Sequence, residues 1–203
     1  YWLWFALLCA VTTFLCFRCL GVKAIDSWDE ARHGISAYEM LKNKQFLVNT
    51  YLGKPDYWNV KPPLSFLSVA AGFVLCGYNA VGLRFFSALF YLLTVIFTGL
   101  FARKYSRLAS LLTMVFLCAN YFPFKAHLAR AGDADSLYLL LFTLSMLCML
   151  KVRDNGRWLY ACGLFFSLAF LTKSFHAGMI AAVGGLFLLL TKELFHQKPK
   201  RWI

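Results

Sequence analysis

The chain has 203 residues, of which 61% are hydrophobic and 15% are charged, and its mean hydropathy is +0.62. This composition excludes an ordinary soluble domain, because long apolar runs are typical of membrane spans. A net charge of +12 would suggest nucleic-acid binding in a soluble protein. Here the basic residues lie mainly in short loops between apolar runs, where they set membrane orientation, so no nucleic-acid partner is expected.

Apolar segments along the chain predict an all-α, polytopic membrane bundle. Inside a bilayer the backbone N–H and C=O groups have no water to bond to, and a helix satisfies them within one segment. The expected spans are 2–22, 81–102, 108–122, 137–150, 158–172 and 177–194. Segment 64–76 is shorter than the roughly 20 residues of a span, so we expect an interfacial helix there. The polar segment 23–63 is then the first outer loop. Residues 1–203 are expected to form a single domain fragment of a longer protein, since the first residue is Tyr1 rather than Met.

Positive charge gathers in segments 103–107, 151–157 and 192–201, which lie at every second turn between the predicted spans. The positive-inside rule makes that side of the membrane cytoplasmic. The opposite side then holds the outer loop together with segments 125–135 and 173–176. The polar clusters that could carry chemistry are therefore predicted to face outward together.

The outer loop begins with Ser27-Trp28-Asp29-Glu30, which fits the S-x-x-E capping box, and apolar residues then recur at helical spacing. We expect a short amphipathic helix on the membrane surface. In one interpretation Glu30 only satisfies a backbone N–H and Asp29 only complements the helix dipole. In the other, one of the two carboxylates reaches a substrate, because adjacent helix residues point about 100° apart.

Lys61 precedes Pro62-Pro63 at the point where the polar loop meets an apolar segment, the level of lipid phosphates. Two interpretations stay open at this position. The ammonium group binds a phosphate, or it anchors the segment by snorkelling to the interface.

Ionisable residues also gather at the outer edges of later spans. Asp133 or Asp135 could cap the helix that follows them, and Arg130 could pair with Asp133. Ionisable residues at the edge of a span are also candidates for function. Lys173 adds a cation, and His176 a group able to titrate near neutral pH, although a lone histidine is more often polar filler.

The seven cysteines fall in or beside apolar stretches. Cys16 and Cys19 form a C-x-x-C pair that no second Cys or His pair accompanies. We therefore interpret the cysteines as small buried hydrophobes rather than metal or redox groups.

The order and spacing of several short motifs resemble those of the GT-C membrane glycosyltransferases. The chain is most similar to the branch of protein O-mannosyltransferases and lipid A aminoarabinose transferases, and the likeness covers most of its length. The motifs are the D-E-x-R of Asp29-Glu30-Ala31-Arg32, the K-P-P-L of Lys61-Pro62-Pro63-Leu64, the helix entry Gly77 to Arg84, and Arg130 followed by Asp135.

This resemblance implies an inverting transfer of a sugar from a polyprenyl-phosphate carrier to a hydroxyl or phosphate of a lipid, glycan or protein. The expected location is the bacterial inner membrane, with the site facing the periplasm and membrane lipids as further partners. Asp29 maps to the catalytic centre with Glu30 beside it, and Lys61 is expected near the carrier phosphate. The remaining residues expected to bind substrate are Arg32, Arg130, Asp135, Lys173 and His176.

The residue types suit this chemistry, because a carboxylate base activates a hydroxyl acceptor and cations stabilise a leaving phosphate. A retaining mechanism would need a closely opposed nucleophilic carboxylate, which the adjacency of Asp29 and Glu30 does not supply. In the aminoarabinose branch a Glu precedes the lysine and can join a metal site, but this chain has Val60 there. No metal ligand is therefore assigned, and a divalent metal cofactor stays open.

The main alternative is a secondary transporter or channel subunit, and a third is a non-catalytic scaffold. Transporters place charges near the middle of the membrane on broken helices of related halves. In this chain the charges gather at one face and no related halves are seen, which favours the enzyme.

Overall fold

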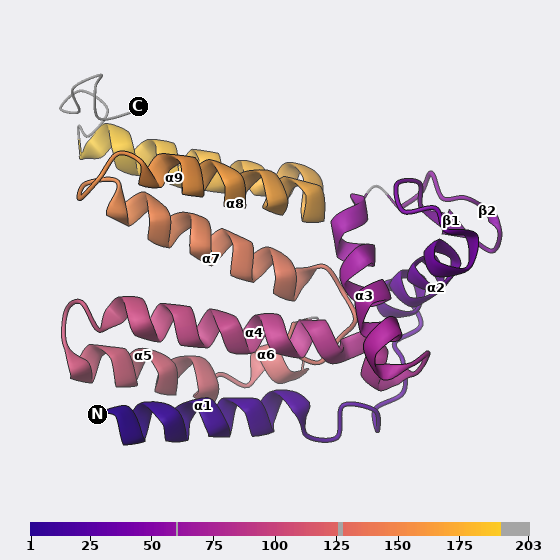
Figure 1. The fold of residues 1–203 in the computed structure, drawn as a ribbon, viewed down its shortest axis with the longest axis horizontal. Coiled ribbons are helices and arrows are strands. Elements are labelled where there is room, and N and C mark those ends of the chain that lie inside the picture. Colours follow the sequence, from indigo (N-terminus) through magenta and orange to yellow (C-terminus); the bar gives the residue numbers. More distant parts are fainter. Residues whose placement is uncertain (60, 126–127, 192–203) are drawn as a thin grey trace.

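The computed structural model describes residues 1–59, 61–125 and 128–191, and its long helices lie side by side along the long axis of the molecule (Figure 1). They are α1 (Trp2–Phe17), α4 (Ala80–Ala102), α5 (Arg107–Ala119), α7 (Asp135–Lys151), α8 (Trp158–Lys173) and α9 (Gly178–Leu190). The helical fold expected from the sequence is confirmed, and the predicted segments match these helices within a few residues at most ends.

One end of the bundle, on the right in Figure 1, carries the elements of the outer loop. These are α2 (Asp29–Asn43), β1 (Thr50–Tyr51), β2 (Lys54–Pro55) and α3 (Pro63–Cys76). The 128–134 loop and the 3-10 helix η1 (Ser174–Ala177) reach the same end, whereas the loops 103–106 and 152–157 lie at the other. The fold thus brings together the segments that the sequence predicts on one side of the membrane.

Two helical stretches, Ala80–Ala102 and Trp158–Leu190, are long and apolar enough to cross a membrane by length and composition. The second stretch contains α8, η1 and α9, and it folds back on itself, so that α8 and α9 run side by side (Figure 1). Ser174, at a φ of 48°, marks this reversal. The first predicted span ends early, at Phe17, because Arg18 is extended and Cys19 has a φ of 53°. The number of spans stays a prediction.

The turn between α3 and α4 is closed by close backbone contact and by a side-chain cap. A Cβ atom on Gly72 would lie 2.1 Å from the carbonyl oxygen of Gly82, so only glycine lets the two helices approach this closely. The Asn79 side chain accepts hydrogen bonds from the N–H groups of Val81 and Gly82, which satisfies two open donors at the start of α4. This hairpin fixes α3 against the bundle.

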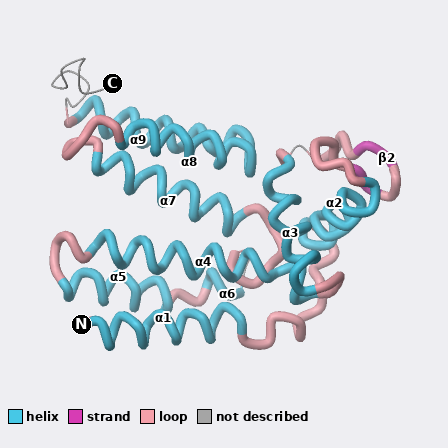
Figure 2. The backbone as a smooth tube through the Cα atoms, in the orientation of Figure 1, coloured by secondary structure: helices cyan, strands magenta, loops and turns pink. Residues whose placement is uncertain are grey.

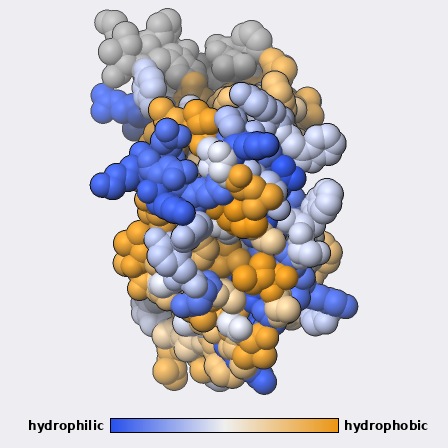
Figure 3. Space-filling model, turned by 90° about the vertical axis from the view of Figure 1, so that its right-hand side faces the viewer, coloured by the Kyte–Doolittle hydropathy of each residue, from blue (hydrophilic) through white to orange (hydrophobic). Residues whose placement is uncertain are grey.

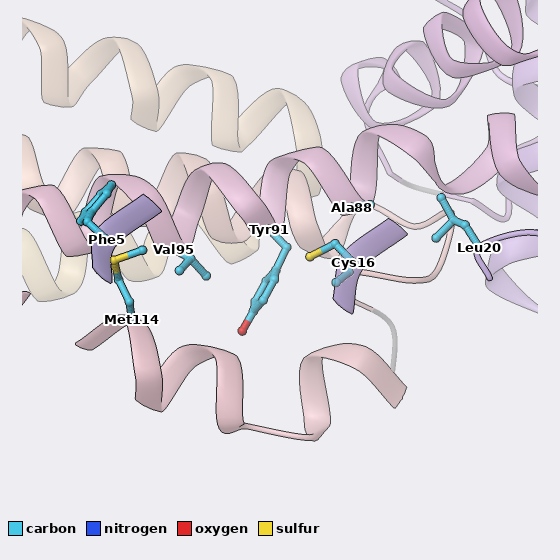
Figure 4. Close-up of a cluster of buried hydrophobic side chains, with 8 residues drawn as sticks. Phe5, Cys16, Leu20, Ala88, Tyr91, Val95 and Met114 are labelled. Carbon is cyan, nitrogen blue, oxygen red and sulfur yellow. The ribbon is translucent and has the colours of Figure 1, made fainter. Parts of the chain in front are cut away.

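A cluster of buried side chains joins α1, α4 and α5 (Figure 4). Tyr91 lies at its centre, 1% exposed, and its hydroxyl donates to the carbonyl of Leu117 at 2.9 Å. Phe5, Cys16 and Met114 pack around it. Cys16 is fully buried here, as expected for a cysteine that packs as a small hydrophobe, whereas its C-x-x-C partner Cys19 is exposed, contrary to that expectation.

The outer loop differs from the expectation of a nearly all-helical backbone, because β1 and β2 form a short antiparallel hairpin (Figure 2). Leu52 and Gly53 make its two-residue turn, with φ values of 53° and 75°. Positive φ at both positions suits the right-handed twist of a hairpin. The Gly53 N–H donates to Glu39 Oε1 at 3.0 Å, which ties the turn to α2.

Hydrophilic side chains gather on the end of the molecule that carries α2 and the hairpin, with apolar side chains set among them (Figure 3). Exposed aromatic residues of this region include Trp28, Tyr57 and Trp58. A mixture of aromatic and charged side chains is typical of a membrane–water interface.

Candidate active site

A cluster of charged side chains from three segments lies where α2, the loop before α3 and the 128–134 loop meet. Lys61 is its centre: its Nζ lies 3.0 Å from Asp133 Oδ1 and 3.5 Å from Asp29 Oδ1. The three residues are far apart in sequence, so the tertiary fold alone brings them together.

The backbone around Lys61 is held by its neighbours. The Asn49 side chain donates to the Lys61 carbonyl at 3.1 Å, and the Lys61 N–H donates to Asn59 Oδ1 at 3.3 Å. Pro62 is the N-cap of α3 and Pro63 its first residue, a position that suits proline because no N–H is needed there. The K-P-P motif therefore projects Lys61 from the start of an apolar helix.

The two carboxylates beside Lys61 differ in exposure. The Asp29 side chain is 40% exposed, at the first residue of α2, where the helix dipole favours a negative charge. The Asp133 side chain is only 4% exposed. Burial alone would raise the pKa of Asp133, but the Lys61 ammonium and the hydrogen bond from the Ala134 N–H hold it below its usual value. Asp133 is thus a fixed anion behind Lys61, and Asp29 an accessible one.

His33 lies behind this cluster and is fully buried. Its Nδ1 lies 2.9 Å from the Asp29 carbonyl oxygen, which can only accept, so Nδ1 carries the hydrogen. Its Nε2 lies 3.8 Å from Asp133 Oδ1 and has no hydrogen-bond partner among the residues that the structure describes. The ring stacks on Phe66 at 4.6 Å between centroids. Burial is the main cause of a lowered His33 pKa, so the imidazole is neutral at pH 7.

Glu30 occupies a different environment from Asp29. It is 1% exposed and pairs with the equally buried Arg84, whose Nε and Nη2 donate to it at 2.6 and 2.8 Å. The N–H groups of Asp26 and Gly132 also donate to Glu30, each at 2.9 Å. Burial opposes its ionisation, but these hydrogen bonds outweigh burial and place its pKa below the usual value.

The predicted capping box is therefore wrong in detail. The N-cap of α2 is Trp28, which makes no side-chain cap, and Glu30 accepts from the Asp26 N–H and not from Ser27. The Glu30–Arg84 pair instead ties the start of α2 to α4. Because Gly132 precedes Asp133, the same pair also fixes the loop that supplies Asp133. Glu30 is placed to hold the site together, which leaves Asp29 as the accessible carboxylate of the two.

Arg32, expected to bind substrate, forms a bidentate pair with Asp56 at 2.8 and 2.9 Å. Its guanidinium also lies over the ring of Tyr51 at 4.8 Å. The hydrogen bonds from Arg32 are the main cause that lowers the pKa of Asp56. Arg32 thus clamps α2 to the hairpin and to the loop that leads to Lys61.

A second ion pair joins the ends of two bundle helices. Lys173, the last residue of α8, pairs with Asp135, the first residue of α7. The Tyr138 hydroxyl donates to the His176 carbonyl at 2.7 Å, and His176 Nδ1 lies 3.3 Å from the Lys173 carbonyl. Since Asp135 follows Asp133 by two residues, this pair is a close neighbour of the Lys61 cluster along the chain. The predicted residues Asp135, Lys173 and His176 are therefore brought together.

Arg130, in the 128–134 loop, contacts the end of α1. Its Nη2 donates to the carbonyl oxygens of Arg18 and Cys19, at 2.9 and 3.2 Å, just beyond the end of α1. Arg130 contacts the end of α1 rather than Asp29 or Lys61, and its role in binding substrate stays a prediction.

A pocket of about 310 Å³ opens beside Lys61. Its walls include Asn49, Asp56 and Asn59 together with Pro62 and Pro63. Leu47, Val48 and Tyr57 also line it, so the pocket offers a space of mixed polar and apolar character beside Lys61 and at the start of α3.

The described part of the chain contains no group of three or more His, Cys, Asp or Glu side chains placed to hold a metal ion. Val60, where the related branch has a glutamate, lies outside the described residues. The residues present do not fit a metal site of that type, and we derive no step through a metal.

Sequence reasoning missed the roles of Asp133 and His33. The sequence offers Asp133 as a helix cap, as a partner of Arg130 or as one of several span-edge candidates for function, but not as a partner of Lys61. His33 follows Asp29 by four residues, which places both on one face of a helix, so this spacing could have pointed to it. Asp133 gave no comparable local signal, because its partners come from distant segments.

The fold is thus a bundle of long apolar helices that carries an acid–lysine cluster at one end. The family model for dolichyl-phosphate-mannose-protein mannosyltransferases matches residues 60–203, and the chain belongs to this family of GT-C membrane glycosyltransferases. The resemblance noted from the sequence motifs is thereby confirmed.

Individual relatives agree with this assignment. An uncharacterised protein of Aquifex aeolicus is 32% identical over 180 residues, which cover 87% of this chain and 35% of that protein. The crystal structure of ArnT from Cupriavidus metallidurans in the apo state superposes with a TM-score of 0.81 at 23% identity, over 93% of this chain and 36% of that one. The crystal structure of the same ArnT bound to undecaprenyl phosphate superposes with a TM-score of 0.75 at 20% identity, over 94% of this chain and 36% of that one. The chain thus shares the fold of the matching part of ArnT, and it spans about a third of the length of these relatives.

Proposed function

We propose that the protein containing this chain transfers a sugar from a polyprenyl-phosphate donor to a hydroxyl or phosphate of a lipid, glycan or protein acceptor. The proposed location is the non-cytoplasmic face of a bacterial inner membrane, with α2 and α3 at its surface. Family membership supports sugar transfer over the transporter alternative. The related ArnT structure holds undecaprenyl phosphate, which supports a carrier of this chemical class.

The position of Lys61 between two unlike carboxylates carries the proposal. Asp133, buried, fixes the ammonium group from behind, while Asp29, exposed, shares it in front. An arriving phosphate can replace Asp29 as the second partner of Lys61. That exchange would release the Asp29 carboxylate to act as a base.

In the proposed step Asp29 accepts the proton of the acceptor hydroxyl, and the acceptor oxygen forms a bond to the anomeric carbon of the sugar. The bond from that carbon to the carrier phosphate breaks, and polyprenyl phosphate leaves with the electron pair. Lys61 stabilises the charge that develops on this phosphate. Attack opposite the leaving group inverts the anomeric centre, in keeping with one accessible carboxylate rather than an opposed pair.

The neighbouring residues would support this step. Lys173 and Asp135, with His176, would line the far side of the substrate space. Arg32 would act as a positioning residue through Asp56, and Glu30 through Arg84 and Gly132.

The test is release of free polyprenyl phosphate from a polyprenyl-phosphate sugar by the full-length protein in proteoliposomes, with a cell-envelope extract added as the source of the acceptor. We expect Asp29→Asn to lower the rate by about 10²- to 10⁴-fold, the usual contribution of a general base. Lys61→Ala should lower both the rate and the affinity for the carrier. The matched control is Asp154→Asn, in an exposed pair with Lys104 at the opposite end. Unchanged transfer by Asp29→Asn would exclude the proposed base.

A further inference from the structure

A second basic pocket lies apart from the Lys61 cluster. It encloses about 360 Å³ and is lined by residues of the segment after α1, of α4, of α6 (Phe122–Lys125) and of the 128–134 loop. Lys23, Lys125 and Arg130 supply cations from three of these segments. None of the three lies in the candidate active site.

The charges around this pocket do not cancel. Arg84, which also lines the pocket, is neutralised by Glu30 and donates to backbone carbonyl groups, so it adds no net charge. Lys23 pairs with Asp26 at 2.7 Å, but both side chains are about half exposed. Exposed ion pairs contribute little free energy, so an anion can compete for Lys23. Around the pocket are thus three cations, Lys23, Lys125 and Arg130, and one weakly paired carboxylate, Asp26. This excess of positive charge favours the binding of an anion.

Arg130 is held in a fixed position to meet that anion. Its Nη2 donates to two carbonyl groups beyond the end of α1. Among the described residues, no acceptor bonds to its Nε or Nη1. A guanidinium with free donors and a fixed plane matches the geometry of a phosphate group.

The walls of the pocket favour a lipid over a soluble anion. Tyr121, Phe124 and Leu20 line it beside the cations, and Lys125 Nζ lies 5.4 Å from the centre of the Tyr121 ring. Tyr121 is 68% exposed. Aromatic rings next to lysine and arginine at the ends of apolar helices are typical of contact with lipid headgroups.

We propose that Lys23, Lys125 and Arg130 form a second anion site that binds the phosphate of an anionic lipid, separate from the site of Lys61. This inference does not depend on the proposed sugar transfer. The lipid source is either a membrane phospholipid or a polyprenyl phosphate, since both present the same phosphate chemistry.

The test is native mass spectrometry of the full-length protein with phosphatidylglycerol, undecaprenyl phosphate or phosphatidylcholine. All proteins carry Lys61→Ala, so that the first site does not contribute. We expect the two anionic lipids to bind and phosphatidylcholine to bind much more weakly. Each of Lys23→Ala and Lys125→Ala should weaken anionic-lipid binding about fivefold, since a lysine near a lipid surface contributes on the order of a fivefold change in affinity.

The matched control is Lys104→Ala, a lysine of the opposite end that also pairs with an exposed aspartate, and it should leave binding unchanged. Arg130→Ala should also weaken binding, but it loses the contacts with α1, so the two lysine variants decide the result. Equal binding of phosphatidylcholine, or undiminished binding by the Lys23→Ala/Lys125→Ala double variant, would overturn the site. Displacement of the lipid by millimolar inorganic phosphate would overturn its assignment to lipids.

Discussion

Replacing Glu30 with glutamine separates the structural role of this residue from a catalytic one. Glu30→Gln keeps the size of the side chain but leaves the Arg84 charge buried without a counter-ion. Removing one partner of a buried ion pair costs about 3–5 kcal/mol. The hydrogen bonds from Arg84 to the carbonyl groups of Leu20, Lys23 and Ala24 remain, so they do not add to the loss.

The measurement is equilibrium unfolding of the full-length protein in mixed micelles, compared with Asp29→Asn. Asp29 is exposed, and Lys61 keeps Asp133 when the Asp29 charge is removed. We therefore expect Asp29→Asn to change the free energy of unfolding by no more than about 0.5 kcal/mol, as for other surface substitutions. Transfer activity should show the opposite order, with the larger loss in Asp29→Asn.

A double-mutant cycle extends this test. Glu30→Met and Arg84→Met each leave one buried charge unpaired, whereas the double variant leaves none, so its cost should be clearly smaller than the sum of the two. The double variant still loses stability, because the N–H groups of Asp26 and Gly132 lose their acceptor. Wild-type stability of Glu30→Gln together with lost transfer would refute this reasoning and make Glu30 catalytic.

Two further predictions concern stability. Burial lowers the pKa of His33, so the folded protein keeps it neutral while the unfolded chain takes up a proton below its ordinary value of 6.5. The folded state then binds fewer protons than the unfolded chain, so the free energy of unfolding should decrease as the pH drops from 7.5 to 5.5. Thermal unfolding measured over this pH range should show a smaller decrease for His33→Gln than for the wild type. An equal decrease in the two proteins would contradict the argument from burial. Gly72→Ala should cost about 1–3 kcal/mol, because its Cβ would clash with the Gly82 carbonyl. Gly163→Ala, with open space around the new Cβ, is the matched control, and equal stability of the two variants would contradict the close contact of α3 and α4.

The sequence alone determined the class of fold and the positions of most helices. Apolar runs of near-span length leave the backbone no alternative to helix in a membrane, so their bounds can be predicted from composition. The pattern of basic loops also placed the polar segments together, and the structure has them at one end. Short motifs identified the family and pointed to Asp29 and Lys61.

Only the tertiary structure decided which of these residues meet. Asp29 and Glu30 are adjacent in sequence, yet the one is exposed beside Lys61 and the other is buried against Arg84. Asp133 became the second partner of Lys61 because three distant segments converge, and Arg130 was directed to the end of α1 instead. Periodicity reports which face of a helix is buried but not what it is buried against, and the energy of an ion pair depends on that partner and on its distance from water.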